Sequence, residues 1–175
     1  MNIVIMGPVG SGKSTQAQLI ARELGISTLN TGDLLYFKSK EDSDIGQLIS
    51  SAMRAGEIVD EGLTLDLIEK HLREKEHQKG FVLDGFPRTI WQAENLKIPI
   101  NKAIYLATSD AVNTKRLLNR GRSDDTLMVI EKRLKVYHRE TQPILSFYRK
   151  KGILIEINGE RDVDEILDDI LEKIK

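Results

Sequence analysis

Cysteine is absent from this sequence of 175 residues. Its absence excludes disulfide bonds, thiolate metal sites and cysteine nucleophiles together. Long apolar runs are absent as well: no stretch approaches the roughly 20 apolar residues that span a bilayer. The first apolar run, residues 3–6, is far too short for the core of a signal peptide. We therefore expect a cytoplasmic protein with no structural zinc and no membrane partner.

A charge excess of either sign is also missing. Charged residues make up 30% of the chain, but 26 basic side chains oppose 27 acidic ones and leave a net charge of −1. A protein that coats nucleic acid is normally strongly basic, so a nucleic-acid partner is not expected. With 40% hydrophobic residues the chain can bury one sizeable core, and we expect a single domain over residues 1–175.

Short apolar runs alternate with helix-period segments from end to end, which is the pattern of an α/β domain with a parallel sheet. β-branched residues are frequent in the short runs, and this suits strands that are buried on both faces. The expected strands cover residues 2–6, 27–30, 81–83, 103–106 and 153–157. The expected helices cover residues 14–24, 64–72, 111–119, 127–137 and 163–174. Between residues 31 and 79 successive helical patterns without a strand indicate a helical arm over the sheet.

A glycine-rich segment lies between the first expected strand and the first expected helix. Residues 7–14, GPVGSGKS, fit the P-loop (Walker A) pattern G-x-x-x-x-G-K-[ST] in the context that it requires. Glycines let consecutive backbone N–H groups turn toward an anion, and the helix N-terminus adds partial positive charge. A plain glycine turn with an exposed lysine is the weaker alternative. The residues of this loop expected to bind ATP are Gly10, Ser11, Gly12, Lys13, Ser14 and Thr15.

A carboxylate ends the third expected strand. Asp84 follows the apolar residues 81–83, which is how P-loop proteins bring an acid to the outer shell of a bound metal ion. A turn residue before Gly85 is the alternative reading. Because Ser14 of the P-loop supplies a hydroxyl for Mg²⁺, we expect Mg²⁺ as the cofactor, with ATP as a substrate.

Three more segments narrow the choice among P-loop proteins. They are residues 31–33 (TGD), residues 84–89 (DGFPRT) with Gln92, and residues 120–125 (RGRSDD). Together with the P-loop, in this order and spacing, they resemble adenylate kinase and its relatives, the nucleoside monophosphate kinases. The resemblance covers essentially the whole chain, and DGFPRT is highly specific.

The resemblance implies a P-loop NTPase fold with a five-stranded parallel sheet flanked by helices. It implies that the arm at about residues 31–60 binds the monophosphate and that about residues 120–126 form a minimal lid. Family members with a long lid insert a small domain at that point, which sometimes carries zinc, and this chain lacks the insertion. Arg120 and Arg122 are separated by one residue, a shorter lid than the family leads us to expect.

The resemblance also assigns roles to arginines. Arg88 follows Pro87 at the end of a strand, where α/β proteins bind ligands, and matches the arginine that grips the acceptor phosphate in relatives. Arg116 and Arg120 match residues that pack on the ATP adenine and reach phosphate. Arg122 and Arg133 match lid and post-lid arginines, although a solvated surface remains an alternative for each of the last four. The expected catalytic residues are Lys13, Arg88, Arg120, Arg122 and Arg133.

The acceptor side follows from the same resemblance. The residues expected to bind AMP are Thr31, Gly32, Tyr36, Val59, Gly85, Arg88 and Gln92. Gln92 would hydrogen-bond the base, but Thr89 and Gln92 also fit a helix capping box, and Thr31 fits an N-cap. Asp33 resembles a residue that orients magnesium-bound water, so the expected metal set is Ser14, Asp33 and Asp84, mostly through water.

One acceptor residue departs from the family. Tyr36 stands where relatives have an arginine on the acceptor phosphate, and we hypothesise that Lys38 or Lys40 replaces its charge. Thr31 and Gln92 point to AMP, which makes an adenylate kinase the expected function. The alternatives are a kinase with broad or non-AMP specificity (UMP, CMP or deoxynucleoside monophosphates) and a regulatory nucleotide-binding module of ATPase type.

Overall fold

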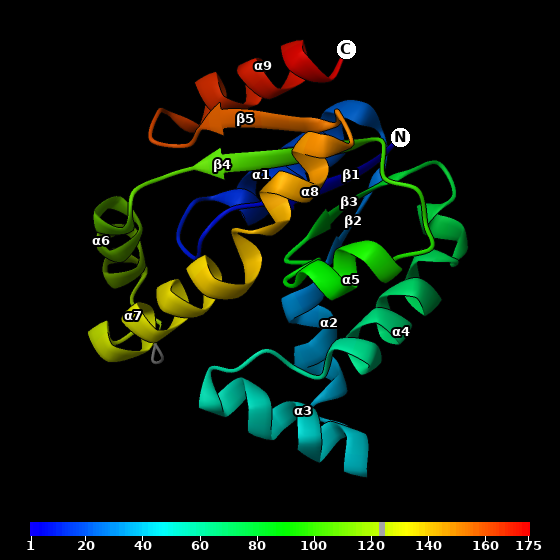
Figure 1. Cartoon of the computed structure of the whole chain (residues 1–175), viewed down its shortest axis with the longest axis vertical. Coiled ribbons are helices and arrows are strands. Elements are labelled where there is room, and N and C mark those ends of the chain that lie inside the picture. Colours follow the sequence, from blue (N-terminus) through cyan, green and yellow to red (C-terminus); the bar gives the residue numbers. More distant parts are fainter. Residues whose placement is uncertain (123–124) are drawn as a thin grey trace.

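A five-stranded parallel sheet forms the centre of the molecule, in the strand order β2-β3-β1-β4-β5 (Figure 1). The computed structural model describes residues 1–122 and 125–175. The strands are β1 (Asn2–Met6), β2 (Ser27–Asn30), β3 (Phe81–Asp84), β4 (Lys102–Ala107) and β5 (Leu154–Asn158). The predicted α/β fold is confirmed, and each predicted strand end lies within one residue of the observed one.

Successive residues of a strand face opposite sides of the sheet, so the sheet has two apolar cores. Ile3 and Ile5 of β1 pack against α1 (Lys13–Leu24) and α9 (Val163–Ile174). Val4 and Met6 belong to the core on the other face. The helices that cover this second face are α4 (Glu61–Leu72), α5 (Ile90–Asn95) and α8 (Ile144–Lys150).

The chain between β2 and β3 forms the predicted helical arm. It contains α2 (Thr31–Lys38), α3 (Asp44–Ala55), α4 and the short 3₁₀ helix η1 (Lys75–His77). Leu35, Ile49 and Val59 are buried in a small apolar cluster of the arm's own, separate from the two cores of the sheet. In Figure 1, α3 lies at the end of the molecule far from the sheet.

On the other side of β1, α6 (Asp110–Arg120) is followed by α7 (Leu127–Val136) and the π-helical turn η2 (Tyr137–Thr141). The sequence pattern predicts a helix over residues 127–137 but not the π-turn. The helical period also misses α5 and α8, which have six and seven residues and are too short to show it clearly, although the capping box at Thr89 marks the start of α5. No helix in the described residues is long and apolar enough to span a membrane.

His77 differs from what its charged sequence surroundings suggest. A surface or boundary position is expected for all three histidines, but His77 is buried, and its Nδ1 lies 2.6 Å from the hydroxyl oxygen of Ser27. Burial lowers the pKa of His77, with Glu76 acting in the opposite direction. The native protein therefore resists a proton that the unfolded chain accepts near the ordinary pKa of 6.5.

We predict that His77 makes the protein less stable as the pH falls through about 6.5. Thermal unfolding followed by circular dichroism at pH 7.5 and 5.5 tests this. The melting temperature of the wild type should fall a few degrees more than that of His77→Gln, which has no charge to gain. Hydrogen bonds to Gln142 and Asp110 raise the pKa of His138, so His138 stabilises the folded protein at low pH. This contribution is the same in the wild type and in His77→Gln, so it does not affect the comparison. Equal falls in the two proteins would contradict the prediction.

Candidate active site

The P-loop joins the C-terminal end of β1 to the N-terminus of α1. At Gly10 the backbone has φ of +88°, and a Cβ there would lie 2.8 Å from the carbonyl oxygen of Asn113 in α6. Only glycine allows this close contact. Around Gly12, the N-cap of α1, no atom lies within 4 Å of an added Cβ, and no side chain caps the helix. Among the described residues no side chain competes for the N–H groups at the start of α1, which suits an anion site.

Lys13 lies at the centre of a group of charges. Its Nζ donates a hydrogen bond to the carbonyl oxygen of Pro8 at 3.2 Å, and so reaches back across the loop. Desolvation lowers the pKa of Lys13, Asp84 acts against this shift, and Arg88 and Arg120 add to it. The P-loop lysine, the β3 carboxylate and two of the predicted arginines thus lie close enough to influence one another.

Asp84 is buried at the end of β3. Its Oδ2 accepts a hydrogen bond from Nδ2 of Asn30 at 2.6 Å, and its Oδ1 is buried without a hydrogen-bond partner in the described residues. Asn30 also caps α2, because its Oδ1 accepts from the N–H of Asp33 at 3.0 Å. The N-cap considered for Thr31 is therefore wrong: Asn30 has that position, and Thr31 is buried with its hydroxyl unpaired in the part of the chain that the structure describes.

The donor set fits a magnesium ion shared with a nucleotide. No group of three or more His, Cys, Asp or Glu in the described part of the chain could hold a metal ion by itself. Mg²⁺ commonly uses one or two protein groups and completes its shell with water and substrate phosphates. The unpaired Oδ1 of buried Asp84 and the exposed Ser14 hydroxyl suit that arrangement, while Asp33 is exposed on α2.

The acceptor side contains a small cavity between the arm and the body. Thr31, Val59, Gly85, Arg88 and Gln92 from the predicted AMP-binding set line it, whereas Gly32 and Tyr36 do not. Arg88 contributes the only charge among these lining residues. The remaining lining residues are Leu35, Ile58, Thr64 and Phe86.

Short contacts within the chain hold the DGFPRT segment. The Phe86–Pro87 peptide bond is cis. Nε of Arg88 donates to the carbonyl oxygen of Gly85 at 2.9 Å, and the N–H of Arg88 donates to Oε1 of Gln92 at 2.7 Å. Thr89 caps α5 by accepting from the N–H of Gln92 at 3.3 Å. The N-cap position predicted for Thr89 is thus confirmed, whereas Gln92 reaches back to the N–H of Arg88 and not to that of Thr89. The same glutamine lines the acceptor cavity.

Tyr36 is half-exposed on α2. Nζ of Lys40 lies 4.9 Å from the centre of its ring, a cation–π contact. Lys38 is instead paired with Glu41 at 2.7 Å within the arm. The hypothesis of a substitute cation therefore narrows to Lys40, whose charge is presented beside Tyr36.

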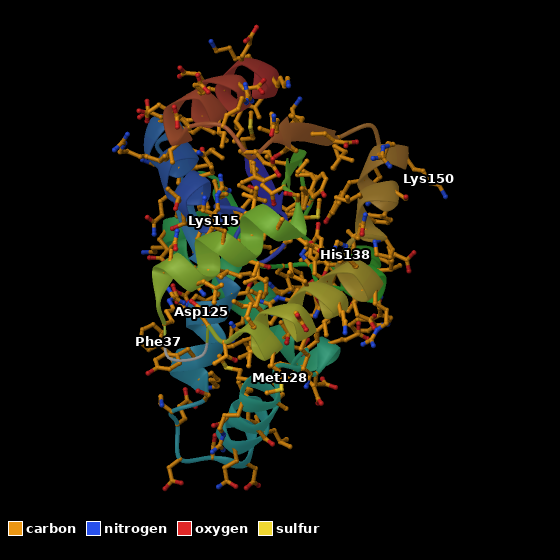
Figure 2. The ribbon with its side chains drawn as sticks, turned by 90° about the vertical axis from the view of Figure 1, so that its left-hand side faces the viewer. Phe37, Lys115, Asp125, Met128, His138 and Lys150 are labelled. Atoms are coloured by element: carbon orange, nitrogen blue, oxygen red, sulfur yellow. The ribbon has the colours of Figure 1, made fainter. Side chains whose placement is uncertain are left out.

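Asp125 joins two of the predicted catalytic arginines, and sequence reasoning did not assign it a role. Its side chain is fully buried and accepts two hydrogen bonds from Arg120, at 2.8 and 2.7 Å. Arg133 of α7 lies 3.7 Å from the same carboxylate. Figure 2 shows Asp125 near the turn between α6 and α7. The bonds from Arg120 hold the pKa of Asp125 below its usual value, so the carboxylate stays charged.

The other predicted residues of this region lie around the same turn. Nη1 of Arg116 donates to the carbonyl oxygen of Ser11 at 3.3 Å and so ties α6 to the P-loop. Arg122 is exposed and follows the C-cap Gly121 of α6. Of the predicted lid at residues 120–126, positions 123 and 124 lie outside the described residues.

A larger hollow, of about 560 Å³, lies elsewhere, between α6, α7 and η2. None of the predicted site residues lines it. His138 and Asp110, whose facing atoms are 3.0 Å apart, are among its walls. The active-site assignment therefore rests on the convergence of motifs, not on the size of a cavity.

Comparison with protein families matches residues 5–153 to the family described as adenylate kinase. The chain belongs to the adenylate kinase family. Among curated relatives, the adenylate kinase of Parasynechococcus marenigrum (strain WH8102) is 41% identical over 171 residues, which are 94% of this chain and 93% of that protein. The adenylate kinase of Prochlorococcus marinus (strain MIT 9211) is 40% identical over 171 residues, 94% of this chain and 91% of that protein.

A longer member of the family also aligns with the whole chain. The adenylate kinase of Methanocella arvoryzae is 35% identical over 213 aligned positions, which cover 100% of this chain and 99% of that protein. The alignment is longer than the 175 residues of this chain, so that relative contains inserted residues. These matches identify a nucleoside monophosphate kinase, a phosphotransferase, and favour neither of the alternatives left open by the sequence.

The Asp125 carboxylate supports a prediction about arginine placement. Asp125→Asn keeps the shape of the side chain but removes the charge that holds Arg120, so we expect kcat to fall about tenfold through misplacement. The protein should lose about 1–2 kcal/mol of stability, because a charge-assisted bond pair is weakened at a buried site. Initial rates and thermal melts measure the two effects.

Asp110→Asn is the matched control for this variant. Asp110 is also an aspartate of the α6–α7 region, but it is exposed and faces His138. We expect its kcat to stay within twofold of the wild type. Equal kcat values for Asp125→Asn and the wild type would show that Arg120 does not need the carboxylate.

Proposed function

We propose that this chain catalyses reversible transfer of the γ-phosphoryl group of MgATP to AMP, which yields two molecules of ADP. An oxygen of the AMP phosphate attacks the γ-phosphorus as the bond from that phosphorus to the β,γ-bridging oxygen breaks. The electron pair stays with the departing ADP. Phosphoryl transfer asks for positioning and neutralisation of charge more than for covalent catalysis, so no phosphoenzyme is needed.

The convergence of one carboxylate and three cations carries this proposal. Three charged groups lie close enough to Lys13 of the P-loop to shift its pKa: Asp84 from β3, Arg88 from the DGFPRT segment and Arg120 from α6. Four separate segments thus meet beside the ends of β1 and β3, where α/β proteins bind ligands. Such a cluster of cations suits the triphosphate of a donor and the single phosphate of an acceptor that meet in line.

We assign the site residues to an ATP side and an AMP side of the charge cluster around Lys13. On the ATP side, residues 10–15 would hold the phosphates. Arg116 and Arg120 would pack on the adenine and reach phosphate. On the AMP side, Arg88 would hold the phosphate and Gln92 the base, with Lys40 beside Tyr36 as a further cation. The remaining proposed AMP-binding residues are Thr31, Gly32, Val59 and Gly85. Arg122 and Arg133 would neutralise the group in transfer.

Mg²⁺ would be held by Ser14 and Asp84, with Asp33 acting through water. When bound, it would neutralise charge on the β- and γ-phosphates. The arm at residues 31–60 and the turn at 120–126 would close over the two substrates and exclude water. A cytoplasmic location stays a prediction from the sequence.

A panel of acceptors tests the proposed function. Initial rates are measured with MgATP and, in separate reactions, AMP, UMP, CMP and the deoxynucleoside monophosphates, with a reaction that contains no acceptor as the control. Turnover that is highest with AMP supports the proposal. A higher rate with another base would assign a different acceptor, and hydrolysis of ATP with no acceptor dependence would indicate a nucleotide-binding module.

A further inference from the structure

The arm has an apolar cluster of its own, which would let it move relative to the sheet. Its apolar cluster around Leu35, Ile49 and Val59 is completed by side chains of α3 and α4. The cores on the two faces of the sheet do not include these three residues. No residue of α3 belongs to those cores, so a shift of α3 does not require them to open.

In the present position of the arm, the acceptor cavity is almost filled. Its volume of about 10 Å³ has room for roughly one water molecule, whereas pockets for small ligands measure roughly 300–1,000 Å³. Two recognition groups are also engaged within the chain: Arg88 with Gly85, and Gln92 with the N–H of Arg88. The cavity is too small in this conformation for a nucleoside monophosphate, so it must widen before an acceptor can occupy it.

One contact ties the end of the arm to the opposite side of the molecule. Nζ of Lys132 in α7 donates a hydrogen bond to the carbonyl oxygen of Ala55, the last residue of α3. Figures 1 and 2 both place this end of α3 beside α7. Within residues 1–122 and 125–175, no other hydrogen bond or ion pair of Lys132 accompanies it.

The charge and geometry of this contact suit a reversible tie. Gly56 and Glu57 already donate to the carbonyl oxygens of Met53 and Ala52. The carbonyl of Ala55 stays unpaired within α3, at the helix end that carries partial negative charge, and the Lys132 ammonium satisfies it. Because Lys132 is exposed, the bond is weak enough to break in the working cycle.

We propose that Lys132 latches the arm in this acceptor-excluding position and thereby lowers the apparent affinity of the enzyme for its acceptor. When a ligand binds only one of two conformations, its apparent affinity is its intrinsic affinity multiplied by the fraction of molecules in the binding conformation. The bond between Lys132 and Ala55 stabilises the closed, empty arm, and it breaks when α3 moves away from α7. The inference rests on the proposed function only for the identity of the acceptor, AMP.

Kinetics of Lys132→Met test the latch. The variant keeps the length of the side chain but cannot bond to the carbonyl, so we expect KM for AMP to fall about two- to fivefold. KM for ATP and kcat should stay within twofold. Lys135→Met is the matched control, since Lys135 lies on the same helix but lines the hollow between α6, α7 and η2. An unchanged or raised KM for AMP would overturn the proposal.

A distance measurement without nucleotide tests the same latch independently of activity. The chain has no cysteine, so Ser51→Cys in α3 and Lys115→Cys in α6 give two specific sites for spin labels. Double electron–electron resonance should show a larger population at long distance in Lys132→Met than in the wild type or Lys135→Met. Identical distributions would refute the latch. A shift in an enzyme that does not phosphorylate AMP would keep the latch and refute the proposed acceptor.

Discussion

Replacing Lys13 by methionine is expected to lower kcat about 10³-fold, because a preorganised positive charge is removed from the point where phosphate charge develops. ATP binding should weaken by no more than about tenfold, since the backbone N–H groups of the P-loop and the start of α1 remain. Initial rates of ADP formation and calorimetric titration with ATP separate the two effects. A kcat within tenfold of the wild type would show that Lys13 is not part of the reacting centre.

Lys13→Met is expected to lower activity but not stability. Lys13 is partly desolvated and lies near Arg88 and Arg120, which both disfavour its charged form. Removing that charge should leave the melting temperature unchanged or raise it, as expected for a site that stores unfavourable charge for catalysis. Lys115→Met, on α6 and labelled in Figure 2, is the control for loss of a lysine, and neither its activity nor its stability should change.

The fold was predictable from the sequence wherever a local pattern decides the structure. Buried parallel strands are short apolar runs, and the boundaries of β1 and β2 were predicted to the residue. The π-turn η2 and the short helix α8 were not, because they depend on contacts with the rest of the chain. Tyr137 of η2 lies near Tyr105 of β4, and Tyr148 of α8 is buried in the core that contains Val4 of β1.

The candidate site shows the same division. The P-loop, Asp84 and Arg88 lie in contiguous motifs, and the structure brings their charges together. Asp125 and Asn30 were missed, since their importance lies in partners that the sequence does not reveal. Asn30 reaches Asp84, which is 54 positions away, and Asp125 reaches Arg133 in the next helix. An aspartate after an arginine-rich turn was the one available signal for Asp125, and it is equally typical of a solvated loop.

Arg88→Ala is expected to impair the use of AMP while leaving the binding of ATP nearly unchanged. Arg88 is the only charged residue among the described residues that line the acceptor cavity, and it lies close enough to Asp84 and Arg133 for their charges to act on it. If Arg88 holds the AMP phosphate as proposed, loss of its guanidinium should lower kcat/KM for AMP about 10²–10³-fold. The affinity for ATP should change less than threefold, because the P-loop remains intact.

Arg88→Lys distinguishes charge from geometry at this position. It restores the positive charge without the planar fork, and we expect it to recover about tenfold of the lost kcat/KM. Full recovery would mean that Arg88 acts only through its charge. If Arg88→Ala instead weakened ATP binding as much as AMP use, the residue would belong to the donor side. The assignment of the cavity between arm and body to the acceptor would then be wrong.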